Sequence, residues 1–495
     1  MKRSFFALVS LVLIASMVLS ACGATPEPTP APPTATQAAV ATEAPTEVPT
    51  AEATPEPAAT PTATPIVIEN PEVPEGSIPI RWYIGLGAGS NPEEVEKEKA
   101  FQAKFNEKYG DKYTLLLDVV SNATAYDVLK TQIAAGDVPD IVGPVGVRGL
   151  WSFEGAWMDL APYIEKTNYD VSDFNPALVD FYKLGPQGQI GLPFAVYPSA
   201  LWYNKDLFDE AGLEYPPHEF GAKYADGDDW TFDKLAELAT FLTVDANGND
   251  ATMSSYDPEN AVQFGYYPQW TDLRGQWTFF EAGSFNDNGT AVLPEVWAEA
   301  AKWHFDAMWK THFMPTSNYV NSDMLAQGNV FSSGKVAMVP IHTWYTCCFG
   351  EVNWDIAAIP SYNGNITAKL HADTFSILKG TKNPDAAFEV LSLFLGEFAP
   401  DLVALYGAFP ARASLQDSAL TAMAEKYPEA DLNVFVEALS YPDNPNHESG
   451  MPNFLKASDR YSTFASLYQS DGTIDLDAEL EKLIADLQAI FDEVK

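Results

Sequence analysis

The chain has 495 residues, of which 68 are acidic and 28 are basic, so its formal net charge is −40 at pH 7. A surface this acidic repels polyanions, which excludes nucleic acid and anionic membrane surfaces as expected partners. Neutral or cationic small ligands fit the charge better. The region after residue 77 has roughly 420 residues, more than one hydrophobic core accommodates, so we expect two lobes.

The first 22 residues are typical of an export signal. Lys2 and Arg3 precede an apolar run from Phe5 to Leu19, which is short for a membrane span. The sequence "LSAC" resembles the lipobox of bacterial lipoproteins, in which the cysteine is acylated, so we expect a lipid on Cys22. The alternatives are an ordinary signal peptide with an incidental cysteine, or an uncleaved helix.

Residues 23–77 are rich in Pro, Thr, Ala and Glu and contain no aromatic residue, Lys or Arg. Such a composition cannot bury enough apolar surface to offset the entropy lost on ordering, so it predicts disorder. Proline favours extended, semi-rigid spacing. We therefore expect a tether that holds the folded part away from the membrane.

A strand, a turn and a helix are predicted at the start of the folded part. Residues 78–84 form an apolar strand pattern that leads into the turn "GLGAGS". Ser90 or Asn91 can cap the helix that follows, and Pro92 suits its first turn. Aromatic residues recur on one face of this helix: Phe101, Phe105 and Tyr109.

Strands and helices continue to alternate along the chain. We predict a strand over 113–120, a helix over 125–136 closed by Gly136, and a short buried strand over 138–144. This alternation indicates an α/β fold with parallel strands. Ligands bind beyond the carboxyl ends of such strands, and three stretches are candidates for that place: Gly85–Ser90, Asn122 and Asp140–Pro144.

Several later segments carry a resemblance to a known family. They include "TQIAAGDVPDIV" at 131–142, "YNKDLFDEAGL" at 203–213 before a Trp-Thr-Phe helix start, "FSSGKVAM" at 331–338 and "KNPDAAFEVLSLFL" at 382–395. In this order they resemble the extracellular solute-binding proteins of ABC importers, the large family that includes maltose-binding protein. The resemblance covers nearly all of the folded part.

The resemblance implies two α/β lobes joined by a hinge, with the ligand cleft between them and each lobe discontinuous in sequence. We place the crossings at "FAVYPS" and near "WDIAAIP". The expected boundaries are 78–196 for the first part of lobe 1, 197–356 for the first part of lobe 2, 357–405 for the return to lobe 1 and 406–495 for the return to lobe 2.

No signature of an enzyme is found in the sequence. It lacks H-E-x-x-H, G-x-S-x-G and a Walker A loop, and "GLGAGS" has Ser90 where a dinucleotide fingerprint needs glycine. The six histidines are scattered, and "DANGND" at 245–250 departs from a calcium loop. We therefore expect no catalytic residue, no metal site and no cofactor, although so many acids leave a glycosidase carboxylate pair open.

A sugar site needs aromatic rings to cover apolar sugar faces and Asp, Asn, Gln or Arg to bind the hydroxyls. Aromatic residues make up 13% of the chain. The candidates lie where loops or the hinge are expected to face the cleft, and packing or surface polarity is the alternative for each. The candidate ligand-binding residues are Asn122, Asp140, Tyr197, Trp270, Arg274, Gln276, Trp277, Trp344, Tyr345, Cys347, Cys348, His371, Asp373 and Arg412.

Cys347 and Cys348 are adjacent in a chain with only three cysteines. Outside the cytoplasm thiols tend to pair, and with Cys22 acylated these two have only each other. A bond between neighbours closes an eight-membered ring, which would give a rigid apolar patch beside Trp344 and Tyr345. Two reduced thiols acting as small hydrophobic groups are the equal alternative.

Together these features predict a monomeric, lipid-anchored binding protein of an ABC importer outside the cytoplasm. It would capture a mono- or oligosaccharide between two lobes and deliver it to the permease. Two other functions stay open. One is a surface-tethered carbohydrate-active enzyme, and the other is the same fold binding a cation such as a polyamine.

Overall fold

A computed structural model of the chain describes residues 66–184 and 187–494, apart from the side chains of Ala177 and Cys347. All of these residues belong to one compact unit, Thr62–Lys495. The predicted signal, Cys22 and residues 23–65 of the predicted tether lie outside the described residues. Among the described helices, none is both long and apolar enough to cross a membrane.

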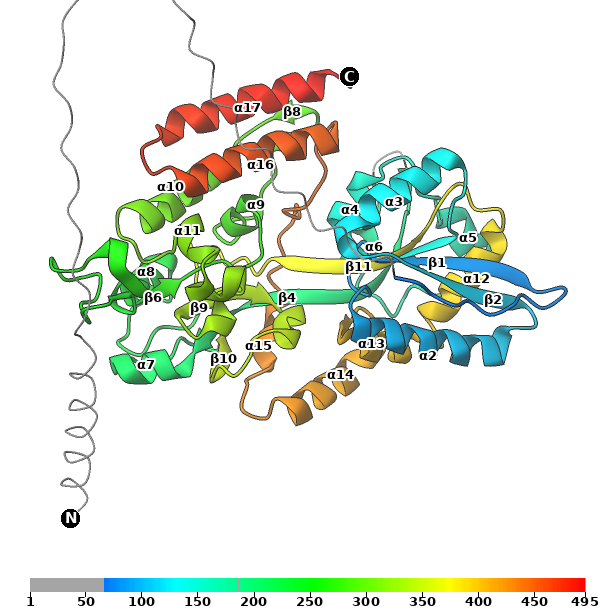
Figure 1. The fold of residues 1–495 in the computed structure, drawn as a ribbon, viewed down its shortest axis with the longest axis horizontal. Helices are drawn as coiled ribbons and strands as arrows, with labels where there is room; N and C mark the ends of the chain where they lie inside the picture. Colours follow the sequence, from blue (N-terminus) through cyan, green and yellow to red (C-terminus); the bar gives the residue numbers. More distant parts are fainter. Residues whose placement is uncertain (1–65, 185–186, 495) are drawn as a thin grey trace, which may run out of the picture. The chain divides into compact units, whose positions relative to one another are not determined.

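One strand, β4 (Leu192–Asn204), passes through both halves of the fold, and all 13 of its residues are buried (Figure 1). Its first half pairs antiparallel with β11 (Leu370–Ile377) and β12 (Phe409–Pro410). Its second half pairs antiparallel with β9 (Val336–His342) and β10 (Trp354–Ala357). The lobes therefore share one 10-stranded sheet, whose main order is β2-β1-β3-β11-β4-β9-β6-β5.

Lobe 1 contains the parallel strands β1, β2 and β3 and the helices beside them. Its elements before β4 are β1 (Ile78–Ile84), α2 (Pro92–Tyr109), β2 (Tyr113–Val119), α3 (Asn122–Ala135), β3 (Ile141–Gly146), α4 (Val147–Ser152), α5 (Ala161–Thr167) and α6 (Pro176–Asp180). After β11 the chain adds α12 (Pro384–Phe394) and α13 (Ala399–Tyr406). The predicted alternation of strands and helices is confirmed here.

Local sequence signals explain the boundaries of these helices. Asn91 caps α2 through a capping box with Glu94, and Gly136 ends α3 in the left-handed conformation at φ 72°. The aromatic face of α2 packs inward. The Phe101 ring lies 5.7 Å from that of Trp82 and 5.5 Å from that of Phe394, which joins α2 to β1 and α12.

Lobe 2 is larger and surrounds the second half of β4. Its elements before β11, apart from β9 and β10, are α7 (Lys205–Ala211), α8 (Phe232–Phe241), β5 (Val244–Asp245), η2 (Pro258–Asn260), β6 (Ala261–Tyr266), α9 (Leu273–Trp277), β7 (Asn286–Asp287), β8 (Thr290–Ala291), α10 (Glu295–Trp309), α11 (Ser317–Val320), η3 (Asp323–Gly328), η4 (Phe331–Ser333) and η5 (Thr343–Cys347). The C-terminal elements are α14 (Ala413–Lys426), α15 (Asn433–Ala438), α16 (Phe454–Ser470) and α17 (Leu476–Asp492).

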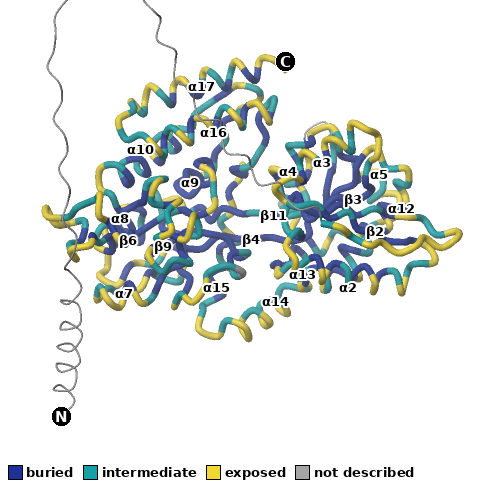
Figure 2. The backbone as a smooth tube through the Cα atoms, viewed as in Figure 1, coloured by how far each residue is buried: buried dark blue, intermediate teal, exposed yellow. Residues whose placement is uncertain are grey.

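The tube in Figure 2 shows where the two cores lie: buried residues fill the strands and the inner faces of the helices in both lobes. The lobe 2 core is built around fully buried aromatic residues, among them Trp202, Trp277 and Trp297. Helix α14 is different, because none of its residues is fully buried. Two of its residues, Leu420 and Met423, pack against core clusters of both lobes, so this helix bridges the lobes.

Two expected boundaries differ from the structure. Ala358, Ile359 and Ala368 still pack in the lobe 2 core, so the second crossing lies at β11 and not at residue 357. The folded part also begins before residue 78. The Asn70 side chain accepts from Leu117 N at 2.7 Å and donates to Leu117 O at 2.8 Å. It thus satisfies backbone groups on the outer edge of β2, which gives residues 66–77 a structural role that composition did not indicate.

Glu98 of α2 is a buried carboxyl that the sequence did not single out. Burial raises the pKa of Glu98 to about 8, although a 2.9 Å hydrogen bond from the Tyr406 hydroxyl favours the charged form. A pKa raised in the folded state means that the carboxyl contributes stability below its unfolded pKa. That contribution is lost as the pH rises through about 8.

We therefore predict that Glu98→Gln removes this loss. The wild type should lose stability relative to the variant between pH 5 and pH 9, by a few kcal/mol of unfolding free energy. Urea unfolding at several pH values measures the difference. Glu107→Gln, an exposed change on the same helix, should leave the pH dependence as it is. Parallel pH profiles for wild type and Glu98→Gln would contradict the assignment.

Candidate functional site

A cavity of about 410 Å³ lies between lobe 1 and the segments that lead into lobe 2. Lobe 1 lines it with residues that follow the carboxyl ends of β1, β2 and β3: Leu86, Gly87, Asn122, Tyr126 and Arg148. Strand β11 contributes His371 and Asp373, and the loop before α16 contributes Glu448. Ligands of α/β sheets bind at this end of the strands, so the cavity is the candidate site.

The lobe 1 wall is fixed by short polar contacts between successive loops. The Asn122 side chain donates to Gly85 O at 2.9 Å, and its backbone N–H donates to Ser90 Oγ at 3.2 Å. Gly87 approaches the next loop so closely that a Cβ there would lie 2.9 Å from Pro144 O. The turn "GLGAGS" therefore shapes the cavity wall through backbone approach, as its glycines allow.

Two tryptophans stand where the parallel strands of lobe 2 end. Trp270 follows β6 and Trp344 follows β9, and their rings stack 5.9 Å apart with an interplanar angle of 10°. Trp270 is 45% exposed and has a φ of 49°, a left-handed conformation that costs energy for a non-glycine residue. Strained backbone conformations cluster at ligand-binding sites, so Trp270 stays a candidate for ligand contact.

A row of stacked rings continues from these tryptophans across the hinge. The His342 and His371 rings stack at 3.7 Å, and the His371 and His447 rings at 5.3 Å. The Trp344 indole N–H donates to His371 Nδ1 at 3.4 Å. Burial lowers the pKa of His342 and of His371 well below the ordinary value, so both imidazoles are neutral near pH 7.

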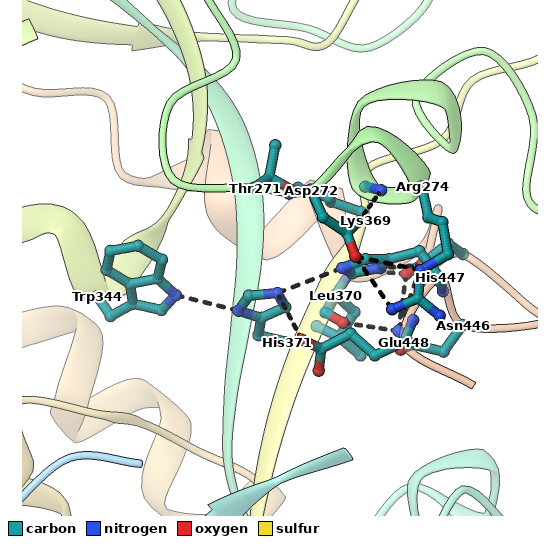
Figure 3. Close-up of polar contacts among 12 residues, drawn as sticks. Thr271, Asp272, Arg274, Trp344, Lys369, Leu370, His371, Asn446, His447 and Glu448 are labelled. Carbon is teal, nitrogen blue, oxygen red and sulfur yellow. Dashed lines mark hydrogen bonds and ion pairs between the residues drawn. The ribbon is translucent and has the colours of Figure 1, made fainter. Parts of the chain in front are cut away.

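Charged groups lie at the His447 end of this row, and Figure 3 shows Asp272, Arg274 and Lys369 close together there. The Asp272 carboxylate contacts Arg274 Nη2 at 3.0 Å, and Lys369 Nζ donates to Thr271 Oγ1 at 2.5 Å. Burial lowers the pKa of Lys369 to about 8, against the pull of nearby acids. Burial, reinforced by the Glu448 carboxylate, raises the pKa of Asp373 to about 7.

Three of the predicted site residues line the cavity: Asn122, His371 and Asp373. Trp344 reaches it indirectly, through its contact with His371, and Trp270 stacks on Trp344.

Other candidates serve packing or lobe structure. Trp277 is fully buried among the rings of Phe285, Trp297 and Tyr468, because α9 points it into the core. Gln276, 2% exposed, lines a separate 150 Å³ cavity within lobe 2. The Tyr345 hydroxyl is used in a 2.6 Å bond to Asn329 Oδ1.

Asp140 and Arg412 are also placed away from the cavity. Strand β3 runs on to Gly146, so Asp140 lies at its amino end, where its carboxylate accepts from Arg81 N at 2.8 Å. The Arg412 guanidinium donates to Tyr169 Oη at 2.8 Å and contacts Asp173 at 3.2 Å, which ties the start of α14 to lobe 1.

Two predicted residues lie beside the site in buried positions. Tyr197 pairs in register with His371 across β4 and β11 but is only 5% exposed. Arg274 is 5% exposed, and its backbone N–H donates to Tyr461 Oη at 2.8 Å.

Cys348 is disulfide-bonded in the structure. The side chain of Cys347 lies outside the described residues, so a ring between the two neighbouring cysteines stays a prediction.

Sequence reasoning missed Arg148, Tyr126 and Glu448. Arg148 follows the true end of β3, and extending that strand by two residues beyond Pro144 would have found it. Tyr126 lies on the second turn of α3, one turn after Asn122. Glu448 belongs to an irregular loop with no periodic pattern, and nothing local in the sequence placed it opposite β11.

The lobes also touch at a glycine. A Cβ on Gly450, in the loop before α16, would lie 2.3 Å from the indole ring of Trp151 on α4. Helices α4 and α16 contact each other at the same place. The lobe 1 and lobe 2 sides of the cavity are therefore in direct contact here in the state that the structure describes.

We predict that Gly450→Ala forces the lobes apart at this contact, because the added methyl group cannot share space with the indole. Small-angle X-ray scattering should then give a larger radius of gyration than for the wild type. Gly472→Ala is a matched control, since its Cβ would meet the Trp309 ring at 2.5 Å inside lobe 2 alone. Equal radii for all three proteins would show that the Trp151 contact does not hold the lobes together.

Comparison with known proteins identifies the fold and the family. A lactose-binding protein of Rhizobium radiobacter is 26% identical over 316 residues, covering 60% of this chain and 66% of that protein. An ABC substrate-binding protein of Listeria monocytogenes, solved with cycloalternan, has a TM-score of 0.61 at 19% identity, over 84% of this chain and 98% of that one.

The GacH receptor of Streptomyces glaucescens has a TM-score of 0.62 at 18% identity, over 85% of this chain and 100% of that one. These likenesses confirm the predicted two-lobed fold of periplasmic binding proteins. The model of the bacterial extracellular solute-binding protein family matches residues 88–397. The chain belongs to the bacterial extracellular solute-binding proteins.

Proposed function

We propose that the chain is the substrate-binding component of an ABC importer for a mono- or oligosaccharide. The observation that carries this proposal is the hinge cavity, about 410 Å³ in volume and lined by an amide, an arginine, two carboxylates and a tyrosine ring. Such groups suit sugar hydroxyls and the apolar face of a sugar ring. The relatives support the ligand class, because their names or titles include lactose, cycloalternan and acarbose.

The proposed mechanism is capture by closure. A ligand in the cavity contacts Asn122 and Arg148 of lobe 1 together with Asp373 and Glu448 at the hinge and on the lobe 2 side. These contacts exist together only when the lobes are shut, so the ligand stabilises the closed state through differential affinity. The closed form would then deliver its sugar to the permease, and the protein performs no chemistry on it.

Two alternatives remain, and each has an observation in its favour. Asp373 and Glu448 are a pair of carboxylates facing one cavity, which a glycosidase would also need. The same acids could bind a cation such as a polyamine. Arg148 in the cavity wall and the raised pKa of Asp373 argue against a site designed for cations.

Isothermal titration with a panel of neutral sugars and polyamines tests the proposal. We expect saturable binding of a sugar, with the sugar recovered intact afterwards. Release of shortened or hydrolysed sugar would instead identify an enzyme, and binding of polyamines alone would identify the cationic ligand.

The stacked tryptophans should contribute to that affinity. We predict that Trp270→Ala and Trp344→Ala each weaken sugar binding by on the order of 1 kcal/mol, the usual contribution of an aromatic stacking contact. Tyr215→Ala is the control, because this ring is an exposed aromatic of the same lobe that packs on Tyr203 and Phe208. Wild-type affinity in both tryptophan variants would remove the two rings from the site.

We further propose that Cys22 is acylated and anchors the protein to the outside of the cell membrane as a monomer. The lipobox and the proline-rich segment support this proposal. Cys22→Ser should release the protein into the soluble fraction and lower the mass of the mature chain by that of its acyl groups. A variant that stays in the membrane fraction at unchanged mass would contradict the anchor.

A further inference from the structure

Three side chains of types that bind metal ions, from two distant parts of the chain, meet beside the hinge cavity. His371 Nε2 lies 3.3 Å from His447 Nε2 and 3.9 Å from Glu448 Oε1. One ligand atom from each residue lies within 4.8 Å of the other two. Figure 3 shows His371 coming from strand β11 and the other two residues coming from the neighbouring loop.

The loop that carries His447 and Glu448 is held rigidly against β11. The Asp443 carboxylate, whose side chain is fully buried, accepts from Leu370 N at 2.7 Å and from His447 N at 2.8 Å. The Asn446 side chain donates to Leu370 O at 2.9 Å. The two loop residues are therefore positioned beside His371 before any ion binds, which lowers the ordering cost of a site.

Asp443 also orients the His447 ring. His447 Nδ1 lies 2.6 Å from Asp443 Oδ2, so this nitrogen carries the proton and donates it to the carboxylate. The lone pair of His447 is then on Nε2, the atom that faces His371. A carboxylate behind a histidine is the arrangement that fixes the tautomer of metal-binding histidines and raises their basicity.

The distances suit a tetrahedral ion. Zinc–nitrogen bonds of about 2.0–2.1 Å at tetrahedral angles place two nitrogen ligands about 3.3 Å apart, the separation of the two Nε2 atoms here. Glu448 is farther away, but its side chain keeps 21% of its surface exposed and can turn toward the ion. A ligand set of two imidazoles and one carboxylate favours zinc, because calcium and magnesium prefer oxygen ligands.

We propose that His371, His447 and Glu448 bind a divalent transition-metal ion of the zinc class. His371 and Glu448 both line the hinge cavity, whereas His447 is only 3% exposed behind them. The fourth coordination position therefore faces the cavity, where water or an oxygen of a bound ligand can occupy it. This proposal goes beyond sugar transport and does not depend on it.

The surrounding charge is compatible with a cation. Lys369 and Arg274 are nearby positive groups, and Asp272, Asp443 and Glu448 act on them as the opposing acids. Arg148 of the cavity wall is a third positive group, so these three acids balance three bases and a divalent ion would meet a near-neutral environment.

Metal binding should also change the contact of His371 with Trp344. In the structure His371 Nδ1 accepts the Trp344 N–H, which leaves the proton of the neutral ring on Nε2. An ion at Nε2 moves that proton to Nδ1, where it faces the indole N–H. The two donors repel each other, so the Trp344 ring must turn, and with it the stack on Trp270.

Zinc titration of the whole chain, prepared without a histidine tag, tests the site. We expect one ion per chain, and a tetrahedral absorption spectrum when cobalt replaces zinc. His371→Gln, His447→Gln and Glu448→Gln should each weaken zinc binding by at least about tenfold. Thermal unfolding of each variant without metal checks that it is folded.

His218→Gln is the matched control, because His218 also lies between two carboxylates, 3.5 Å from Asp355 and 3.2 Å from Asp431, but has no second histidine. It should bind zinc as the wild type does. No zinc uptake by the wild type, or equal uptake by the wild type and the three variants, would overturn the proposal.

The link to Trp344 has its own measurement. Zinc should change the tryptophan fluorescence of the wild type and leave that of Trp344→Phe nearly constant. Trp344→Phe should bind zinc at least as tightly, because it lacks the competing N–H. Weaker zinc binding by Trp344→Phe would overturn the proposed change at His371.

Discussion

The fold depends on one buried strand, β4, whose backbone forms hydrogen bonds with strands of both lobes. The backbone of β4 pairs with β11 as far as Pro198 and with β9 from Ser199 onward, so neither half can slip without leaving buried N–H and C=O groups unpaired. The junction of the lobes therefore lies at the peptide bond between Pro198 and Ser199. Because β1, β2 and β3 end toward the same junction, the loops that bear polar side chains converge on it.

The same junction concentrates buried polar groups, which would be costly without partners. Lys369 donates a hydrogen bond to Thr271 and lies near acids. Asp443 accepts hydrogen bonds from several N–H groups, and Arg274 forms an ion pair with Asp272. Most of these partners come from lobe 2 and its returning loop. The interior of the hinge is thus a polar network built from both lobes, in which Ser199 Oγ, His342 Nε2 and Thr343 Oγ1 have no hydrogen-bond partner in the structure.

In the described state the lobes touch at Trp151, which lies against Gly450 with no room for a methyl group. Under the proposed function a bridging ligand would stabilise that state, and an ion held by His371, His447 and Glu448 would add one more bond from β11 to the returning loop. Transport and metal binding would then act on the same junction.

The sequence by itself determined the local elements and the class of fold. Three features depend only on residues a few positions apart and could therefore be predicted from the sequence: the capping box at Asn91, the left-handed Gly136 and the alternation of strands and helices. It also placed Asn122, His371 and Asp373 near the cleft. Only the tertiary structure decided that Trp277 enters the core and that Arg412 binds lobe 1. It alone brought His447 to His371 across 76 residues, because that proximity depends on hydrogen bonds from a loop to a strand and leaves no periodic trace in the sequence.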